Sequence, residues 1–273
     1  LVAHLVWDQR VAGSNPATPT IIMFLFFKKS KKNQNKTLKI LSGYNFRYSR
    51  IGEKSEKNII KYANHFNFDY EFEKKNKFER HFYWLKIKML IDNLEEGTHK
   101  YYLWLDADTY TFRPITTDFV TGLLPPDKLV NFLGRGEKYP ECGWVCYNRR
   151  HKKITEFMDY WTALYIKDTI FKELEWHDSY LFWQCVKRVA PEDGVDIGKG
   201  AGAKGHHVFI NSVLGAYIDH MKGKRKVLGK SSKSDLRGAR NEEYWKNVES
   251  YDPFGGVKFD PKQADDIVSK VAK

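Results

Sequence analysis

Cysteine is scarce in this 273-residue chain, which has only Cys142, Cys146 and Cys185. An odd number without a CxxC pair argues against a disulfide framework and against a zinc site. Because such usage is typical of a reducing compartment, we expect a cytoplasmic protein. Long hydrophobic runs are missing as well: the longest, residues 21–27, falls far short of the roughly 20 residues that a membrane-spanning helix needs. With no basic segment before it and no cleavage site after it, this run does not resemble a signal peptide.

The composition is that of a globular protein with a basic surface. Aromatic residues make up 15% of the chain and charged residues 29%, which argues against both disorder and a membrane bundle. The length suits one large α/β domain. A net charge of +12 favours anionic partners, such as nucleic acid, acidic membranes or phosphorylated glycans, or is simply a solvated Lys-rich surface.

The first residues have an unusual pattern. Residues 11–19, VAGSNPATP, resemble the in-frame translation of the T arm of a transfer-RNA gene. We therefore expect residues 1–22 to lie outside the natural product and Met23 to be its start; a natural disordered leader is the alternative. The expected organisation is a non-structural leader over residues 1–36, one folded domain over residues 37–250 and a tail over residues 251–273.

Alternating strand and helix patterns predict an α/β sandwich with a mostly parallel sheet. Helical spacing of apolar residues and turn residues such as Gly97 set the element limits. We expect Asp178 or Ser179 to cap the last helix and residues 194–205 to form a flexible, Gly-rich loop. The expected strands cover residues 37–45, 68–72, 101–105, 129–133 and 143–147, and the expected helices cover residues 53–66, 78–94, 154–164 and 178–186.

The strongest chemical signal is a pair of carboxylates, Asp106 and Asp108, directly after the apolar run Tyr101–Leu105. A run this short, with aromatic residues, indicates a buried strand, and ligands bind at the carboxyl ends of strands in open α/β sheets. Like charges in such a place repel unless a cation neutralises them. Carboxylates together with a diphosphate suit Mg²⁺ or Mn²⁺, although a D-x-D on a surface turn is the alternative.

The segment Tyr-Leu-Trp-Leu-Asp106-Ala-Asp108-Thr resembles the DxD strand of the GT-A glycosyltransferases, including the glycogenin-like and lipopolysaccharide galactosyltransferase group. Trp84-Leu-Lys86 resembles the W-x-K helix that precedes this strand in the yeast-type galactosyl- and mannosyltransferases. The resemblance implies a GT-A (Rossmann-like) nucleotide-diphospho-sugar transferase fold. It also implies that Asp106 and Asp108 hold the metal and that Lys86 points toward the donor, whereas a solvated helical lysine is the alternative for Lys86.

Two further segments resemble parts of these families. Glu141-Cys-Gly143 lies where they have an N-x-G segment that lines the donor-sugar pocket, with Glu141 here in place of Asn; a plain strand entry is the alternative. His177-Asp178-Ser-Tyr resembles the acidic segment of the blood-group transferases, one residue shorter. The resemblance makes Asp178 and Glu141 the candidate catalytic residues, and a helix cap is the competing role for Asp178.

The C-terminal segment resembles the H-x-x-G-x-x-K pattern of the glycogenin-like group. By that resemblance His220 is a third metal ligand, and Lys222, Gly223 and Lys226 hold the diphosphate. The resemblance also puts the nucleotide at the end of the first strand, where Tyr44 and Asn45 are the candidates and Tyr48 is a second aromatic that could stack on uracil; a core position is the alternative for either tyrosine.

These observations favour a metal-dependent hexosyltransferase that uses a UDP-sugar, Mn²⁺ or Mg²⁺, and a glycan or phosphorylated-glycan acceptor, with retention as the expected stereochemistry. Peripheral contact with an acidic membrane stays open. A haloacid-dehalogenase-like phosphatase also uses D-x-D, but here Tyr110 takes the fifth position and two strands come first. A basic RNA-binding module leaves the acidic pair without a role, so no nucleic-acid partner is expected.

Overall fold

The computed structural model describes residues 37–75, 83–111, 115–136, 138–166, 173–175, 177–198 and 208–220. Six strands form one sheet in the order β2-β1-β3-β6-β5-β7, and five of them run in the same direction, with β6 opposed. This confirms the predicted α/β class with a mixed, mostly parallel sheet. The strands of this sheet are β1 (Leu38–Asn45), β2 (Asp69–Lys75), β3 (Tyr101–Leu105), β5 (Val130–Arg135), β6 (Lys138–Asn148) and β7 (Gly194–Asp196).

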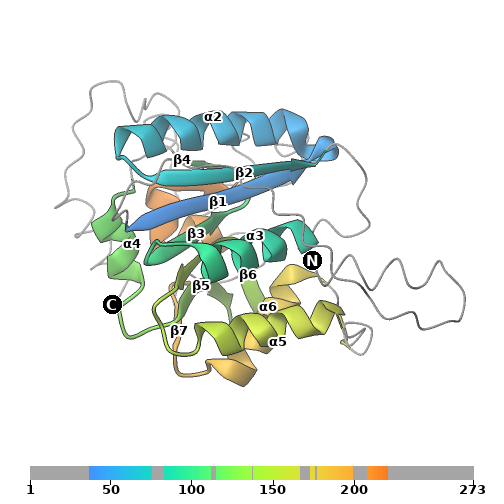
Figure 1. The fold of residues 1–273 in the computed structure, drawn as a ribbon. Helices are drawn as coiled ribbons and strands as arrows, with labels where there is room; N and C mark the ends of the chain where they lie inside the picture. Colours follow the sequence, from blue (N-terminus) through green and yellow to red (C-terminus); the bar gives the residue numbers. More distant parts are fainter. Residues whose placement is uncertain are drawn as a thin grey trace, which may run out of the picture.

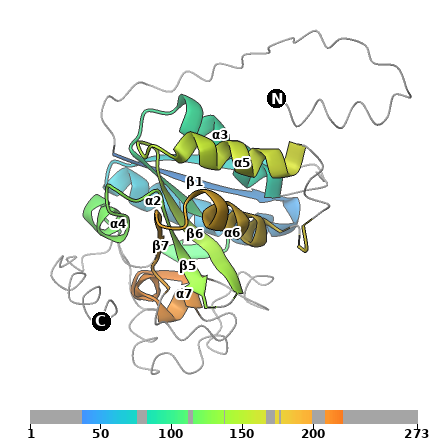
Figure 2. The same ribbon diagram turned by 90° about the horizontal axis from the view of Figure 1, so that it is seen from below.

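Helices cover both faces of the sheet (Figures 1 and 2). On one face the core contains residues of α2, α4 and α7, and on the other it contains residues of α3, α5 and α6. The alternation of side chains along β3 produces this arrangement, because Leu103 and Leu105 enter the first core whereas Tyr102 and Trp104 enter the second. The helices are α2 (Ser49–His65), α3 (Tyr83–Glu96), α4 (Thr117–Leu123), α5 (Ile154–Ile166), α6 (Asp178–Val189) and α7 (Val208–Asn211).

The first long helix, α2, ends in a way that follows from its sequence. Asn67 has a left-handed backbone with φ of 56°, and the amide of Phe68 donates to the carbonyl of Ala63 at 2.8 Å. This is the Schellman arrangement, in which Asn is tolerated at the left-handed position. α2 begins at Ser49, four residues before the predicted start, after a 3₁₀ turn η1 (Phe46–Tyr48).

The strands β5 and β6 form an antiparallel hairpin, which the mostly parallel prediction did not specify. Gly136, with φ of 68°, supplies the left-handed residue at its turn. The register of the hairpin jumps: Phe132 faces Val145, but the next residue, Leu133, faces Glu141. Residues 142–144 of β6 are therefore extra relative to β5 and form a bulge in β6.

Several short elements were not predicted. A second sheet pairs β4 (Thr109–Thr111) with β8 (Ile218–His220), and the 3₁₀ turn η4 (Val213–Ala216) precedes β8. The expectation that residues 194–205 form one loop was wrong for its first part, because β7 pairs in parallel with β5 from Val130 to Phe132. Three residues are too few for a pattern to stand out in a sequence.

The predicted leader, with its start at Met23, and the predicted tail lie outside the described residues. The domain limits expected at residues 37 and 250 therefore stay predictions. Among the described segments, no helix is long and apolar enough to cross a bilayer. All three cysteines are buried and free.

Candidate active site

The two carboxylates lie on a tight turn at the carboxyl end of β3, as predicted. The amide and the hydroxyl of Thr109 both donate to the carbonyl of Asp106, at 3.0 and 2.7 Å, and close the turn. The indole N–H of Trp104 donates to Asp106 Oδ1 at 2.6 Å and orients that carboxylate. The turn presents Asp106 partly exposed and Asp108 buried, at 34% and 4% exposure of the side chain.

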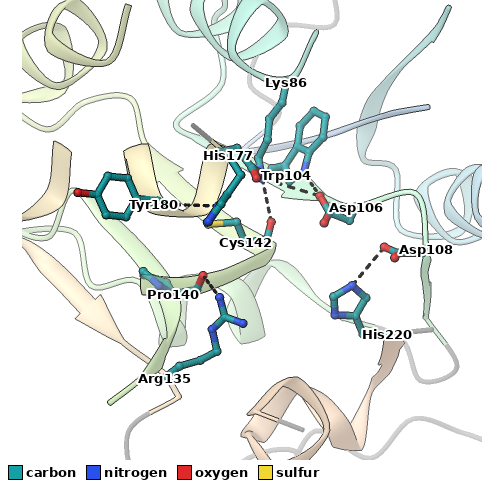
Figure 3. Close-up of polar contacts among 11 residues, drawn as sticks. Lys86, Trp104, Asp106, Asp108, Arg135, Pro140, Cys142, His177, Tyr180 and His220 are labelled. Atoms are coloured by element: carbon teal, nitrogen blue, oxygen red, sulfur yellow. Dashed lines mark hydrogen bonds and ion pairs between the residues drawn. The ribbon is translucent and has the colours of Figure 1, made fainter. Parts of the chain in front are cut away.

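His220 reaches the carboxylates from the far end of the described chain. β8 pairs antiparallel with β4, and Thr109 faces His220 in that register. The imidazole Nε2 lies 3.2 Å from Asp108 Oδ1, and the ring packs against Phe209 with a centroid distance of 4.9 Å. One ligand atom each from Asp106, Asp108 and His220 lies within 4.8 Å of the others (Figure 3). The three residues that the sequence suggested as metal ligands therefore lie together.

A buried asparagine that sequence reasoning missed positions the small sheet. Asn58, on α2, donates from Nδ2 to the carbonyl of Thr111 and accepts from the amide of Thr111, both at 2.8 Å. The side chain takes the place of a neighbouring strand along the edge of β4. Its signal in the sequence is a polar residue directly before the apolar pair Ile59 and Ile60 of an amphipathic helix.

Gly143, the predicted small residue of the donor-sugar pocket, lies in the bulge of β6 and contacts the imidazole of His220. A Cβ atom at this position would lie 2.8 Å from His220 Cε1, which is too close for a real contact. The carbonyl of Gly143 also accepts the amide of Asp106 at 3.0 Å. Glycine is required here because the backbone of β6 runs directly against the imidazole of His220 and is hydrogen-bonded to the backbone of Asp106.

Lys86, for which a direction toward the donor stays a prediction, bridges two acidic residues. Its buried ammonium group lies 2.9 Å from Asp178 Oδ2 and 3.8 Å from Asp106 Oδ1, and it donates to the carbonyl of Cys142 at 2.9 Å. It also lies 5.1 Å from the ring centre of Trp104. The alternative of a solvated helical lysine was wrong, because the residue is only 3% exposed.

The charges at this site shift two pKa values in ways that matter for cation binding. Burial raises the pKa of Asp106, Lys86 opposes that rise, and the carboxylates of Asp108 and Asp178 add to it. Burial lowers the pKa of Lys86, but the neighbouring Asp178 and Asp106 outweigh it and raise the pKa above its usual value. Lys86 thus stays charged, and it only partly offsets the burial and the neighbouring carboxylates that raise the pKa of Asp106.

The helix cap predicted at Asp178 or Ser179 lies one residue earlier. α6 begins at Asp178, and its cap is His177, whose Nδ1 accepts the amide of Tyr180 at 3.2 Å. The capping prediction was wrong because a histidine ring fills the role that short polar side chains usually have. The carboxylate of Asp178 instead points to Lys86.

Glu141, the other predicted catalytic residue, lies on β6 with its side chain only 11% exposed. Its carboxylate is 3.9 Å from the Arg135 guanidinium, which also donates to the carbonyls of Tyr139 and Pro140. Glu141 therefore lies among residues of the β5–β6 hairpin, while Asp178 lies in the ion-pair network with Lys86.

The nucleotide is predicted to bind at the end of β1, and the structure describes both candidate residues there, Tyr44 and Asn45. Tyr44 is only 4% exposed, its hydroxyl donates to Glu56 at 3.0 Å, and its ring packs on Gly52. It therefore has the core position that was the alternative for it. Lys222, Gly223 and Lys226, the predicted diphosphate residues, lie outside the described part of the chain.

Solved structures that resemble this chain share little sequence identity with it. No curated protein sequence matches the chain. A glycosyltransferase involved in the glycosylation of the major capsid of PBCV-1 is 18% identical, with a TM-score of 0.49 over 71% of this chain and 100% of that one. The galactosyltransferase LgtC, solved with donor and acceptor sugar analogs, is 12% identical, with a TM-score of 0.45 over 83% of this chain and 99% of that one. GlyE from Streptococcus pneumoniae TIGR4 is 14% identical, with a TM-score of 0.46 over 86% of this chain and 63% of that one.

A family model gives the decisive match. Residues 18–185, well over half of the 273 residues, match the galactosyl transferase GMA12/MNN10 family. The match includes β3 with its two carboxylates, the bulge of β6 and the start of α6. The predicted GT-A glycosyltransferase fold is thereby confirmed, and the phosphatase and RNA-binding alternatives lose their basis. The chain belongs to the galactosyl transferase GMA12/MNN10 family of glycosyltransferases.

Proposed function

We propose that this glycosyltransferase moves a hexose from a UDP-sugar to a hydroxyl group of a glycan, with a divalent cation held by Asp106, Asp108 and His220. The observation that carries this proposal is the convergence of their ligand atoms within 4.8 Å at the carboxyl edge of the sheet. His220 follows Asp108 by 112 residues, and both of these residues are almost fully buried. A buried carboxylate such as that of Asp108, close to a second carboxylate, is costly unless a cation neutralises the pair.

The chemistry of these residues fits a manganese or magnesium ion. Atoms that share one such ion at about 2.1 Å lie within about 4.2 Å of each other, so small side-chain adjustments suffice. Two carboxylates suit either ion, and the imidazole favours Mn²⁺. When bound, the cation supplies positive charge for the diphosphate as the nucleotide leaves. Burial raises the pKa of Asp106 more than Lys86 lowers it, so a cation beside this carboxylate would favour its charged form.

In the proposed transfer, the bond between the anomeric carbon and the diphosphate oxygen breaks, and its electron pair leaves with UDP. The acceptor oxygen forms the new bond to that carbon and releases its proton. Asp178 is the acidic residue proposed beside the anomeric carbon, where its charge stabilises the positive charge that develops there. Lys86 holds Asp178 in one orientation through its 2.9 Å ion pair. Retention of configuration belongs to this proposal.

The proposed base-binding position lies next to Asn45, after the end of β1. Since the ring of Tyr44 is buried, the exposed aromatics for stacking are Tyr48, at 38% exposure, and Phe46, at 47%. Sequence reasoning named Tyr48 and missed Phe46, although an aromatic residue directly after the strand end was visible. Diphosphate contacts of Lys222, Gly223 and Lys226, a role of Glu141 in catalysis, and a cytoplasmic location remain predictions.

The test is calorimetry of UDP binding to the full chain, with and without Mn²⁺, for wild type, Asp108→Asn and Asp127→Asn. Asp127 is an exposed carboxylate in the loop before β5, which makes it the matched control. UDP at a hundred times its Kd should raise the free energy of unfolding by about 2.7 kcal/mol. We expect Mn²⁺-dependent binding that Asp108→Asn removes and Asp127→Asn retains. If the affinity for UDP changes neither on addition of Mn²⁺ nor in Asp108→Asn, the proposal is contradicted.

A further inference from the structure

A cluster of side chains in edge-on contact surrounds His177, the residue before Asp178. Figure 3 shows His177, Tyr180 and Arg135 on the side away from Asp108 and His220. This Tyr139 cluster comprises Arg135, Tyr139, His177 and Tyr180. The rings of Tyr139 and His177 lie 4.4 Å apart between centres, and Tyr180 lies 6.2 Å from Tyr139. The guanidinium of Arg135 lies 4.9 Å from the ring centre of Tyr139. All four side chains are partly exposed, so a ligand could reach them.

The cluster is joined to the site through short, direct connections. His177 precedes Asp178 in the chain and caps the same helix, so its ring moves with the start of α6. Arg135 donates to the carbonyl of Pro140 and lies near Glu141, at the start of the bulged part of β6. A molecule resting on the cluster would therefore lie next to the carboxylate of Asp178.

The surroundings of the cluster are acidic, in contrast to the chain as a whole. Glu175 contacts His177 Nε2 at 2.5 Å and is 46% exposed. Its carboxylate also acts on Tyr139, since burial first and Glu175 second raise the pKa of that phenol. Glu173 acts on Tyr180 in the same way. Among the described residues here, the cations Lys86 and Arg135 face four carboxylates, those of Glu141, Glu173, Glu175 and Asp178.

We propose that the Tyr139 cluster is the acceptor subsite and that it selects an uncharged glycan over a phosphorylated one. This inference rests on the proposed transferase function and adds to it the acceptor class and the residues that bind it. It also reverses one expectation drawn from composition, because the net charge of +12 had suggested phosphorylated acceptors.

The chemistry of sugars fits this surface. A pyranose ring has an apolar C–H face that packs on an aromatic ring, and its hydroxyl groups donate to carboxylates such as that of Glu175. A phosphate group presents only negative charge at neutral pH and would lie among carboxylates that repel it. In this proposal the anionic donor binds at the cation site, and the uncharged acceptor binds at the Tyr139 cluster.

The test measures UDP release by the full chain with UDP-galactose and Mn²⁺, in the presence of two sets of probes. The first set contains neutral oligosaccharides, namely lactose, cellotetraose and α-mannotriose, and the second contains their 6-phosphorylated forms. The variants are Tyr139→Ala, Tyr139→Phe and Glu175→Lys. Tyr160→Ala is the matched control. Tyr160, on α5, forms a similar pair with Arg188, whose guanidinium lies 5.3 Å from the ring centre of Tyr160.

We expect at least one neutral probe to stimulate UDP release and its phosphorylated form to stimulate at least about tenfold less, a difference of about 1.4 kcal/mol. Tyr139→Ala should raise the KM for the neutral probe about tenfold, with Tyr139→Phe and Tyr160→Ala within threefold of wild type. Glu175→Lys should improve use of the phosphorylated form. UDP and Mn²⁺ affinities, measured by calorimetry, should stay within twofold in every variant.

Stimulation by phosphorylated probes alone, or by none of the probes, would overturn the acceptor subsite, and so would an unchanged KM in folded Tyr139→Ala. These failures are distinguishable from failure of the transferase proposal itself. Loss of Mn²⁺-dependent UDP binding in the wild-type chain would refute the donor site, whereas the acceptor results leave that measurement untouched.

Discussion

Substituting Gly143 by alanine tests how closely β6 supports the proposed cation site. The new Cβ would lie 2.8 Å from His220 Cε1, whereas ordinary contacts begin at 3.4 Å, so the ring must retreat by about 0.6 Å. Metal sites tolerate ligand displacements of only about 0.2 Å. The imidazole cannot simply rotate away, because it is 1% exposed and packs against Phe209. If β6 moves instead, the amide contact from Asp106 to the carbonyl of Gly143 moves with it.

We therefore expect Gly143→Ala to weaken Mn²⁺ binding 10- to 100-fold, or about 1.4 to 2.7 kcal/mol, in a protein that still folds. Overpacking should also lower the free energy of unfolding by about 1 to 3 kcal/mol. The assays are Mn²⁺ calorimetry and urea unfolding without metal. The matched control is Gly122→Ala on α4, where a Cβ meets nothing within 4 Å. A folded Gly143→Ala protein with the Mn²⁺ affinity of wild type would refute this reasoning.

Trp104→Phe removes the indole donor to Asp106, and we expect calorimetry to show Mn²⁺ affinity about tenfold weaker. Because the pKa of Asp106 is raised in the folded protein, folding favours the protonated carboxyl group. The resulting contribution to the free energy of unfolding is present below the usual carboxyl pKa and is lost as the pH rises through the raised pKa. Asp106→Asn should therefore raise the metal-free Tm at pH 7 and abolish stabilisation by Mn²⁺; a lower Tm would contradict this. Lys86→Met leaves buried carboxylates without their cation and should cost about 3 kcal/mol in urea unfolding, against under about 0.5 kcal/mol for exposed Lys88→Met. His177→Ala should cost about 1 kcal/mol by losing the cap of α6, and His177→Asn should restore most of it, both read from thermal unfolding.

The strand that carries Asp106 and Asp108 could be predicted because a run of five apolar residues is too short for a helix, and the two acids mark where it ends. Its burial on both faces follows from the same run. The helices α2, α3, α5 and α6 were also predicted from their spacing, with errors at some ends, such as the start of α2, which lies four residues before the predicted one. The end of α2 before the left-handed Asn67 and the start of α6 after His177 lie within one residue of the prediction. Local patterns report local structure well.

The interactions that assemble the site were out of reach of sequence reasoning, since they join distant segments. Nothing near Lys86 in the chain indicates that its ammonium group binds Asp178, 92 residues later. The role of Asn58 depends on the edge of β4, a strand of three residues that no pattern reveals. The bulge of β6 arises from pairing with β5 and is invisible in the spacing of its own residues.

The pairing of β4 with β8 also has a consequence for how the protein is made. His220 lies 112 residues after Asp108, so a ribosome that has just finished the strand with the two acids has produced no complete cation site. Most of the chain must leave the ribosome before the imidazole can join them, so a chain that ends before β8 lacks one of the three proposed ligands. The proposed cation site is therefore completed late in synthesis, after most of the described domain has been made.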